Sequence, residues 1–232
     1  MKKRLATFTA FVLLVMGCGS LMANLADEET RKLEPFTGIA IGISADVFYS
    51  TGNNHEIRIE GNERDVQDLI TKVEDGILKL RYDNWKVSRS KLTIYITSRE
   101  LDKVSVSGSA KFRAEESISS DEMSLSVSGS GSVLFNSLKS DEIEVRISGS
   151  GNVILEKGSA DEMDVKISGS GNLNAERFEI SELSAGISGS GSCRVTVTDE
   201  LEAKISGSGS IHYHGNPVVD SRTSGSGKVR KL

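Results

Sequence analysis

The stretch VRISGSGNVIL (residues 145–155) returns 20 residues later as VKISGSGNLNA (residues 165–175). The tetrapeptide SGSG at its centre, which reads SGSA in the first copy, recurs through the second half of the chain. Its seven copies begin at Ser107, Ser128, Ser148, Ser168, Ser188, Ser206 and Ser224. Successive copies are 21, 20, 20, 20, 18 and 18 residues apart. A fixed period in this range is typical of a solenoid, in which each repeat forms one coil.

The residues around each tetrapeptide alternate between apolar and polar side chains, which indicates strands with one buried face. The runs before it are MSLSV (123–127), IEVRI (143–147), MDVKI (163–167), LSAGI (183–187) and LEAKI (201–205). Shorter alternating runs such as VIL (153–155) follow it. Residues 101–232 are therefore predicted to form a parallel β-helix of about 18–21 residues per coil. Equivalent residues would stack about 4.8 Å apart, and Val127, Ile147, Ile167, Ile187 and Ile205 would form one inward column.

The glycines of the tetrapeptides are predicted to be structural turn residues. They are Gly108, Gly129, Gly131, Gly149, Gly151, Gly169, Gly171, Gly189, Gly191, Gly207, Gly209, Gly225 and Gly227. A sharp corner between two strands often needs a positive φ, which glycine reaches without steric cost. A phosphate-binding loop is the alternative, but such a loop occurs once per site and opens a helix. This motif recurs between strands.

Residues 33–100 lack the tetrapeptide but read as strands bounded by Gly, Asn and Asp, for example GIAIGIS and KLTIYIT. One segment, NERDVQDLITKV (residues 62–73), has apolar residues on one helical face and predicts a helical turn. We expect this β-rich region to cap one open end of the solenoid, where apolar surface would otherwise be exposed. A small β domain in its own right is the alternative.

Residues 1–26 have the pattern of a secretory signal. Lys2, Lys3 and Arg4 precede an apolar segment that is too short to span a bilayer. VMGC, ending at Cys18, resembles a lipobox, so Cys18 is a candidate for lipidation; the alternative is cleavage after Ala23 or Ala26. Both routes predict an exported protein of the cell envelope. It would be an outer-membrane or surface lipoprotein, held to the membrane only through lipid on Cys18, or a periplasmic or secreted protein.

Charge and motifs exclude several function classes. The net charge of −5 argues against a nucleic-acid-binding protein, which needs a basic surface. The sequence contains no nucleotide-binding loop, HExxH motif, nucleophile elbow or CxxC pair, so we expect no cofactor and no catalytic residue. His212 and His214 lie on one side of a strand without an evident third ligand, and we expect them to be surface residues. Cys193 occupies an apolar position and is expected in the core.

Acidic residues recur just before the inward apolar residue of most repeats. They are Asp121, Glu122, Asp141, Glu142, Asp161, Glu162, Glu182, Asp199 and Glu200. In a β-helix they would stack into a ladder of carboxylates, and like charges directly opposite one another are destabilising. A divalent cation or a basic partner would relieve this repulsion, so the ladder is a candidate interaction face. The alternative is a solvated corner whose charge is compensated by the flanking Lys139, Lys157, Arg146 and Lys166.

The order of these segments resembles a known family. The chain has the opening LEPFTGIAIGISADVFYSTG, the segment VEDGILKLRY, the strand KLTIYIT and then serial SGSG coils. Over residues 33–232 it is similar to the head-GIN domain family, described as auto-transporter adhesins. The resemblance implies a secreted, right-handed parallel β-helix whose molecular activity is not established.

Two functions remain open at this point. The first is a non-enzymatic adhesin, or a surface-binding or structural module, whose ligand is a glycan or a protein. The second is a carbohydrate-active enzyme, such as a polysaccharide lyase or hydrolase, because parallel β-helices also carry these activities. An enzyme would need acids and bases from adjacent coils to converge in a groove. The oligomeric state is not predicted.

Overall fold

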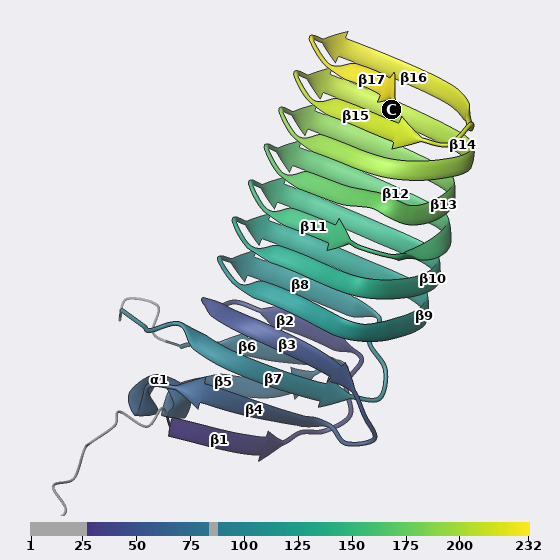
Figure 1. Cartoon of the computed structure of the whole chain (residues 1–232). Coiled ribbons are helices and arrows are strands. Elements are labelled where there is room, and N and C mark those ends of the chain that lie inside the picture. The colour runs from purple at the N-terminus through teal and green to yellow at the C-terminus, as the bar shows by residue number, and fades with distance from the viewer. Residues whose placement is uncertain (1–26, 84–87) are drawn as a thin grey trace, which may run out of the picture.

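The computed structural model describes residues 27–83 and 88–232. Over these ranges the chain forms one continuous sheet of 17 strands, wound into a rod with a short helix near one end (Figure 1). The rod is a parallel β-helix of about six turns. This confirms the predicted all-β fold class.

The repeat region forms the upper part of the rod. Its strands are β8 (Lys103–Gly108), β9 (Lys111–Gly129), β10 (Ser132–Gly149), β11 (Asn152–Leu155), β12 (Gly158–Gly169), β13 (Asn172–Gly189), β14 (Ser192–Gly207), β15 (Ser210–His214), β16 (Val218–Gly225) and β17 (Lys228–Lys231). The pairings between these strands are parallel and join residues one repeat apart. Ile147 pairs with Val127 on one side and with Ile167 on the other, and the column continues through Ile187 to Ile205. These side chains are at most 3% exposed, so the inward column is the predicted one.

A second inward column follows the corners. Val133, Val153, Leu173, Cys193 and Ile211 are paired in succession and are at most 1% exposed. Burial raises the pKa of the Cys193 thiol to about 12. The thiol therefore stays protonated at neutral pH and acts as a small apolar core group, because the thiolate is the reactive form.

The parallel stack extends below the repeats into the region that precedes residue 101. β2 (Gly38–Ile41) and β3 (Ala45–Thr51) make one coil, and β6 (Ile77–Arg81) and β7 (Leu92–Ser98) make another. β2 lies between β6 and β8, and β3 lies between β7 and β9, all in parallel. The later coil in sequence is therefore the lower one in space.

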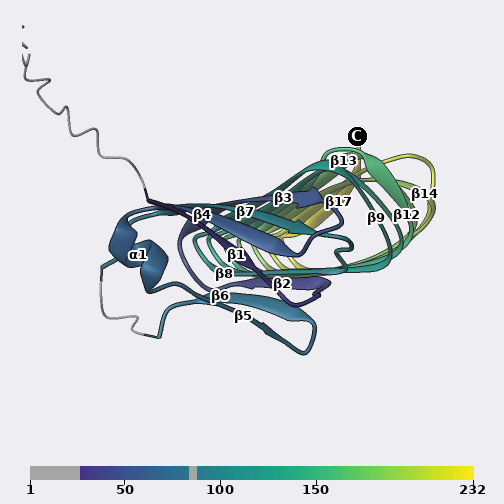
Figure 2. The same cartoon turned by 90° about the horizontal axis from the view of Figure 1, so that it is seen from below.

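Antiparallel strands close this lower end. β4 (Glu56–Gly61) pairs with β7, β1 (Asp27–Lys32) pairs with β4, and β5 (Ile70–Glu74) pairs with β6. Figure 2, seen from the N-terminal end of the stack, shows these strands along the two long sides of a flattened coil. An antiparallel strand interrupts the parallel repeat, so it ends the stack on this side.

The helix α1 (Glu63–Gln67) is shorter than the predicted segment, which ran to Val73. Residues from Ile70 onward instead form β5, joined to β6 by a turn in which Asp75 and Gly76 both have positive φ (53° and 72°). An Asp-Gly pair with this conformation is a strong hairpin signal. Pairing with β6 therefore outweighs the helical periodicity.

Asp65 ties the helix to the chain that follows the undescribed segment. Its carboxylate accepts hydrogen bonds from the Ser90 backbone N–H (2.8 Å) and from the Arg89 guanidinium (3.1 Å). Burial opposes ionisation, but these bonds and the charge of Arg89 outweigh it and hold the pKa of Asp65 below its ordinary value. Asp65 is 5% exposed, so this end of the rod contains a buried carboxylate whose ionised form is favoured by its partners.

The last coil ends the described stack with polar residues. In β16 the inward positions are Val219, Ser221 and Thr223, which pair with the buried Leu201, Ala203 and Ile205 of β14. Ser221 and Thr223 thus occupy the positions that Ala203 and Ile205 occupy in the preceding coil, and they lie where one side of the last coil meets solvent. Within the described residues, no helix is long and apolar enough to cross a membrane.

Candidate functional site

The two glycines of each SGSG corner have different tasks. The first glycine has a positive φ in every copy, between 99° at Gly108 and 122° at Gly189. The second glycine has no positive φ, but a Cβ on it would collide with the coil below. At Gly151 that Cβ would lie 2.8 Å from the Gly131 carbonyl oxygen and against a methyl group of Val127. The corners are thus shaped by backbone conformation at one glycine and by close coil packing at the next.

The acidic residues do stack. Glu122, Glu142, Glu162, Glu182 and Glu200 are paired in register along the rod and are exposed. Asp121, Asp141, Asp161 and Asp199 are exposed at the adjacent corner. Among the described residues, none of these carboxylates forms an ion pair, and no group of three His, Cys, Asp or Glu residues could hold a metal ion. The ladder is an exposed column of negative charge on one side of the strands.

Next to this ladder, the same strands carry a column of ion pairs. In four coils an acidic residue and a basic residue two positions later face solvent side by side. The pairs are Glu144–Arg146, Asp164–Lys166, Glu202–Lys204 and Asp220–Arg222. They stack in register, acid above acid and base above base. The ion pair also has an electrostatic effect, because the hydrogen bond from Lys204 lowers the pKa of Glu202.

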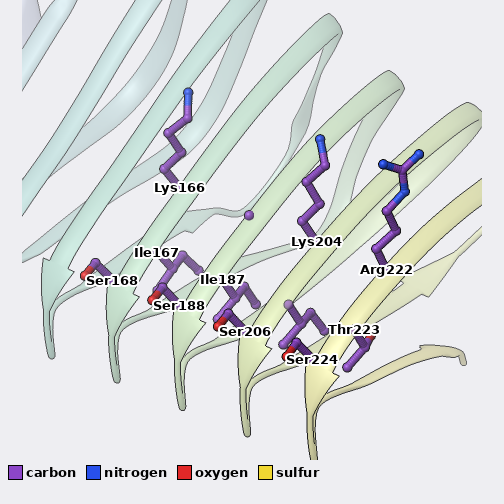
Figure 3. Close-up of a pocket in the computed structure, with 12 residues that line it drawn as sticks. Lys166, Ile167, Ser168, Ile187, Ser188, Lys204, Ser206, Arg222, Thr223 and Ser224 are labelled. Atoms are coloured by element: carbon purple, nitrogen blue, oxygen red, sulfur yellow. The ribbon is translucent and has the colours of Figure 1, made fainter.

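One coil interrupts the column. In β13 the two positions are Ser184 and Gly186, which lie between Asp164 and Glu202 and between Lys166 and Lys204 respectively. A shallow hollow of about 570 Å³ extends across β12, β13, β14 and β16, passes over Gly186, and is bordered by Lys166, Lys204 and Arg222. Figure 3 shows that Lys166 and Lys204 stand further apart than Lys204 and Arg222. A second hollow of about 350 Å³ lies over Ser184, bordered by Asp164 and Glu202 and by four glutamates of the acidic ladder: Glu142, Glu162, Glu182 and Glu200.

The two hollows share their walls. Asp164 borders one and its partner Lys166 borders the other, with 3.0 Å between the carboxylate oxygen Oδ1 and Nζ. On the far side, Glu202 borders the hollow over Ser184 and Lys204 borders the hollow over Gly186, with 2.6 Å between Glu202 Oε1 and Lys204 Nζ. We call this feature the β13 slot: a floor of Ser184, Gly186 and Ser188 between two ion-paired walls. It is a candidate ligand site within the size range of small-molecule pockets, about 300–1,000 Å³.

The three histidines lie apart from the slot. His214 lies on the other side of the rod, where its Nε2 is 3.2 Å from Glu176 Oε1. On the same side, 2.8 Å separates Arg177 Nη2 from Glu156 Oε2. His212 is partly buried between Arg194 and Arg230 in the neighbouring coils. His55 packs edge-on against Phe36 in the N-terminal region.

Sequence reasoning named the neighbours of the slot without finding the slot. Arg146 and Lys166 entered it as charges that compensate the acidic ladder, whereas their own partners are Glu144 and Asp164. The signal was present in the aligned runs IEVRI, MDVKI, LSAGI and LEAKI. LSAGI lacks both charged residues, as does MSLSV (residues 123–127), but only LSAGI lies between charged runs on both sides. Cys18 and the signal segment lie outside the described residues.

The comparisons with known proteins agree on one family. The family model described as "Putative auto-transporter adhesin, head GIN domain" matches residues 35–217. A "putative adhesin" from Bacteroides fragilis is 26% identical with a TM-score of 0.83, over 89% of this chain and 96% of the other. One from Parabacteroides merdae is 26% identical with a TM-score of 0.72, over 90% and 97%. A "putative lipid binding protein" from Parabacteroides distasonis shares the fold at 22% identity, with a TM-score of 0.74 over 90% and 98%. No curated protein matches the chain.

Proposed function

Because the chain belongs to the head GIN domain family, we propose that it is an adhesin-type surface-binding module without enzymatic activity. Its partner is an extracellular or envelope ligand, a glycan or a protein, rather than a nucleic acid. The observation that carries this proposal is the exposed face of β10, β12, β13, β14 and β16, on which charged groups stand in register. A long face of ordered hydrogen-bonding groups is suited to binding an extended ligand, because the rigid strands hold those groups in place before the ligand arrives.

The location that fits this function is the cell envelope. The family name describes adhesins, which act outside the cell. The signal-like segment of residues 1–26 would direct export, either with lipid attached to Cys18 or with cleavage after Ala23 or Ala26. Lipidation would hold the rod at a membrane surface with its long face accessible.

A carbohydrate-active enzyme receives less support from the geometry. Glycosidases use two carboxyl groups that face one glycosidic bond from opposite sides. Glu156 pairs with Arg177 of the next coil, and Glu176 lies next to His214, which is two coils away. Each of these carboxylates has a single partner of its own, an arrangement that fits structural contacts along the rod edge. We therefore assign no catalytic role to them.

Adhesion of living cells tests this proposal. Bacteria that express the full-length protein, and the same bacteria carrying an empty vector, are passed over surfaces coated with single glycans or matrix proteins. We expect the expressing cells to be retained on at least one coating and to release no product from it. Equal retention of both strains on every coating, or turnover of a glycan by the purified protein, would refute the proposed function.

A further inference from the structure

Gly186 has no structural reason to be a glycine. Its φ is not in the positive range, in contrast to the first glycine of each corner. A Cβ on Gly186 would meet nothing closer than the Val165 carbonyl oxygen at 3.8 Å, an ordinary contact. Glycine inside a strand weakens it and often marks a place where a ligand approaches closely. The missing side chain therefore lowers strand stability without a gain in packing.

The gap that results is one side chain wide. β12 and β14 are both neighbours of β13, so two spacings of about 4.8 Å separate them. Lys166 and Lys204 stand on the two outer strands, and nothing projects from β13 between them at Gly186 (Figure 3). A pyranose ring is a puckered saturated ring whose thickness is comparable to that of an alkyl chain. Such a ring fits at the position of Gly186, where the neighbouring coils carry a lysine side chain, and it would pack against the alkyl stems of Lys166 and Lys204.

The charges of the walls select against charged ligands. Cations border the hollow over Gly186, and carboxylates border the hollow over Ser184. A ligand with charge of one sign would be repelled at one of the two hollows. A zwitterion would have to compete with the existing ion pairs, which already join these groups at 3.0 and 2.6 Å.

Hydroxyl groups meet no such conflict, because each hydroxyl both donates and accepts hydrogen bonds. A lysine ammonium has three donors and a carboxylate has about four acceptor positions, so both keep free capacity inside an ion pair. Asp164 Oδ1 is shielded from solvent and lies 3.0 Å from Lys166 Nζ, whereas 39% of the Asp164 side chain remains exposed. The exposed part of this carboxylate can accept a hydrogen bond from a ligand hydroxyl.

We propose that the β13 slot binds one sugar residue of a neutral polysaccharide. The pyranose ring lies over Gly186 between the stems of Lys166 and Lys204. Its hydroxyl groups accept from the two ammonium groups and donate to Asp164 and Glu202. The slot is open to solvent, so the rest of the glycan can continue along the face. This assignment rests on the proposed surface-binding function and names its ligand class.

Titration calorimetry with the full-length protein tests the assignment. The probes are neutral hexasaccharides built from glucose, mannose, galactose or N-acetylglucosamine. We expect at least one to bind the wild type, and Gly186→Lys to weaken its binding at least about tenfold, as when a central contact is lost. Ser126→Lys is the matched control. Ser126 lies on the same outer face three coils from Gly186, pairs with Arg146, and does not border the slot. It should change the affinity less than about twofold, because a residue outside the contact contributes little.

Three results would overturn the assignment. The first is a wild type that binds no hexasaccharide in the panel. The second is an affinity that falls equally in Gly186→Lys and Ser126→Lys, which would place the sugar elsewhere on the face. The third is binding of phosphatidylcholine vesicles that is lost in Gly186→Lys and not displaced by any hexasaccharide, which would assign the slot to a lipid headgroup. In each case cell adhesion by the wild type would still be measured separately, so the surface-binding function could stand without this ligand.

Discussion

Two glycines of the same face should respond to alanine in opposite directions. Gly149 is the first glycine of an SGSG corner, with a φ of 111°. An added Cβ would lie 2.7 Å from the Gly129 carbonyl oxygen and 3.3 Å from its Cα and N. Gly186 has neither constraint, because its nearest neighbour would be an oxygen at 3.8 Å. The pair separates the effect of backbone conformation from the general effect of replacing glycine in a strand.

The expected magnitudes follow from these contacts. A non-glycine residue at the φ of Gly149 costs about 1–3 kcal/mol, and pushing a methyl group into a packed coil costs about 1–3 kcal/mol more. We therefore expect Gly149→Ala to lower the free energy of unfolding by about 3 kcal/mol. That corresponds to a fall in Tm of about 6–12 °C for a chain of this size. Gly186→Ala should raise stability by about 0.5–1 kcal/mol, because alanine loses less backbone entropy on folding.

Thermal unfolding followed by circular dichroism measures both variants against the wild type. The reasoning fails if Gly149→Ala melts at the wild-type temperature, since the positive φ would then carry no cost. It also fails if Gly186→Ala is destabilised as much as Gly149→Ala. That result would mean that packing requires a glycine at position 186. There would then be no reason to infer that the missing side chain makes room for a ligand.

Three further predictions concern the column, the anchor and the cap. Ile167→Asp should unfold the rod because it buries an unpaired carboxylate, whereas Lys166→Asp on the exposed side should shift Tm little; equal Tm values would refute the register. Metabolic labelling with a palmitate analogue should mark the wild type and Cys193→Ala but not Cys18→Ala, and an unlabelled wild type would establish ordinary signal cleavage. The lowered pKa of Asp65 contributes stability that is complete above its unfolded value of about 3.9 and is lost as the pH falls through its folded value. Urea unfolding from pH 7 to pH 2 should show a steeper loss in the wild type than in Asp65→Asn, and parallel curves would exclude this role.

The fold was predictable because one inward column repeats the same information many times. Each copy from Val127 to Ile205 places an apolar residue at the same offset from its corner, and each pairs with the next as expected. The helix was predicted too long because the apolar periodicity of residues 62–73 is a local signal. It does not show that Ile70 and Val73 pair with β6 across the Asp75–Gly76 turn. The order of the lower coils was out of reach, because no local pattern says that β6 lies beneath β2.

The slot was hard to predict for a related reason. A repeat pattern predicts the features that the coils share, which here are the core columns, the corners and the acidic ladder. The slot exists because β13 carries Ser184 and Gly186 where the coils on both sides carry an acid and a base, and it becomes a site only because β12 and β14 stand on either side. Its walls were visible as charges in the sequence, but their pairing within a strand, Asp164 with Lys166 and Glu202 with Lys204, needed coordinates.

A solenoid with identical coils has a difficulty as a binding protein, because every position along its face offers the same contacts and a ligand can slide from one coil to the next. A coil that departs from the rest removes this degeneracy. On this rod the ion pairs of β10 and β12 lie on one side of the departure, and those of β14 and β16 lie on the other. The β13 slot is thus the place where a repetitive ligand would acquire a fixed register. A short ligand should depend on the slot entirely, whereas a long one should keep weaker contacts with the flanking ion pairs when the slot is filled.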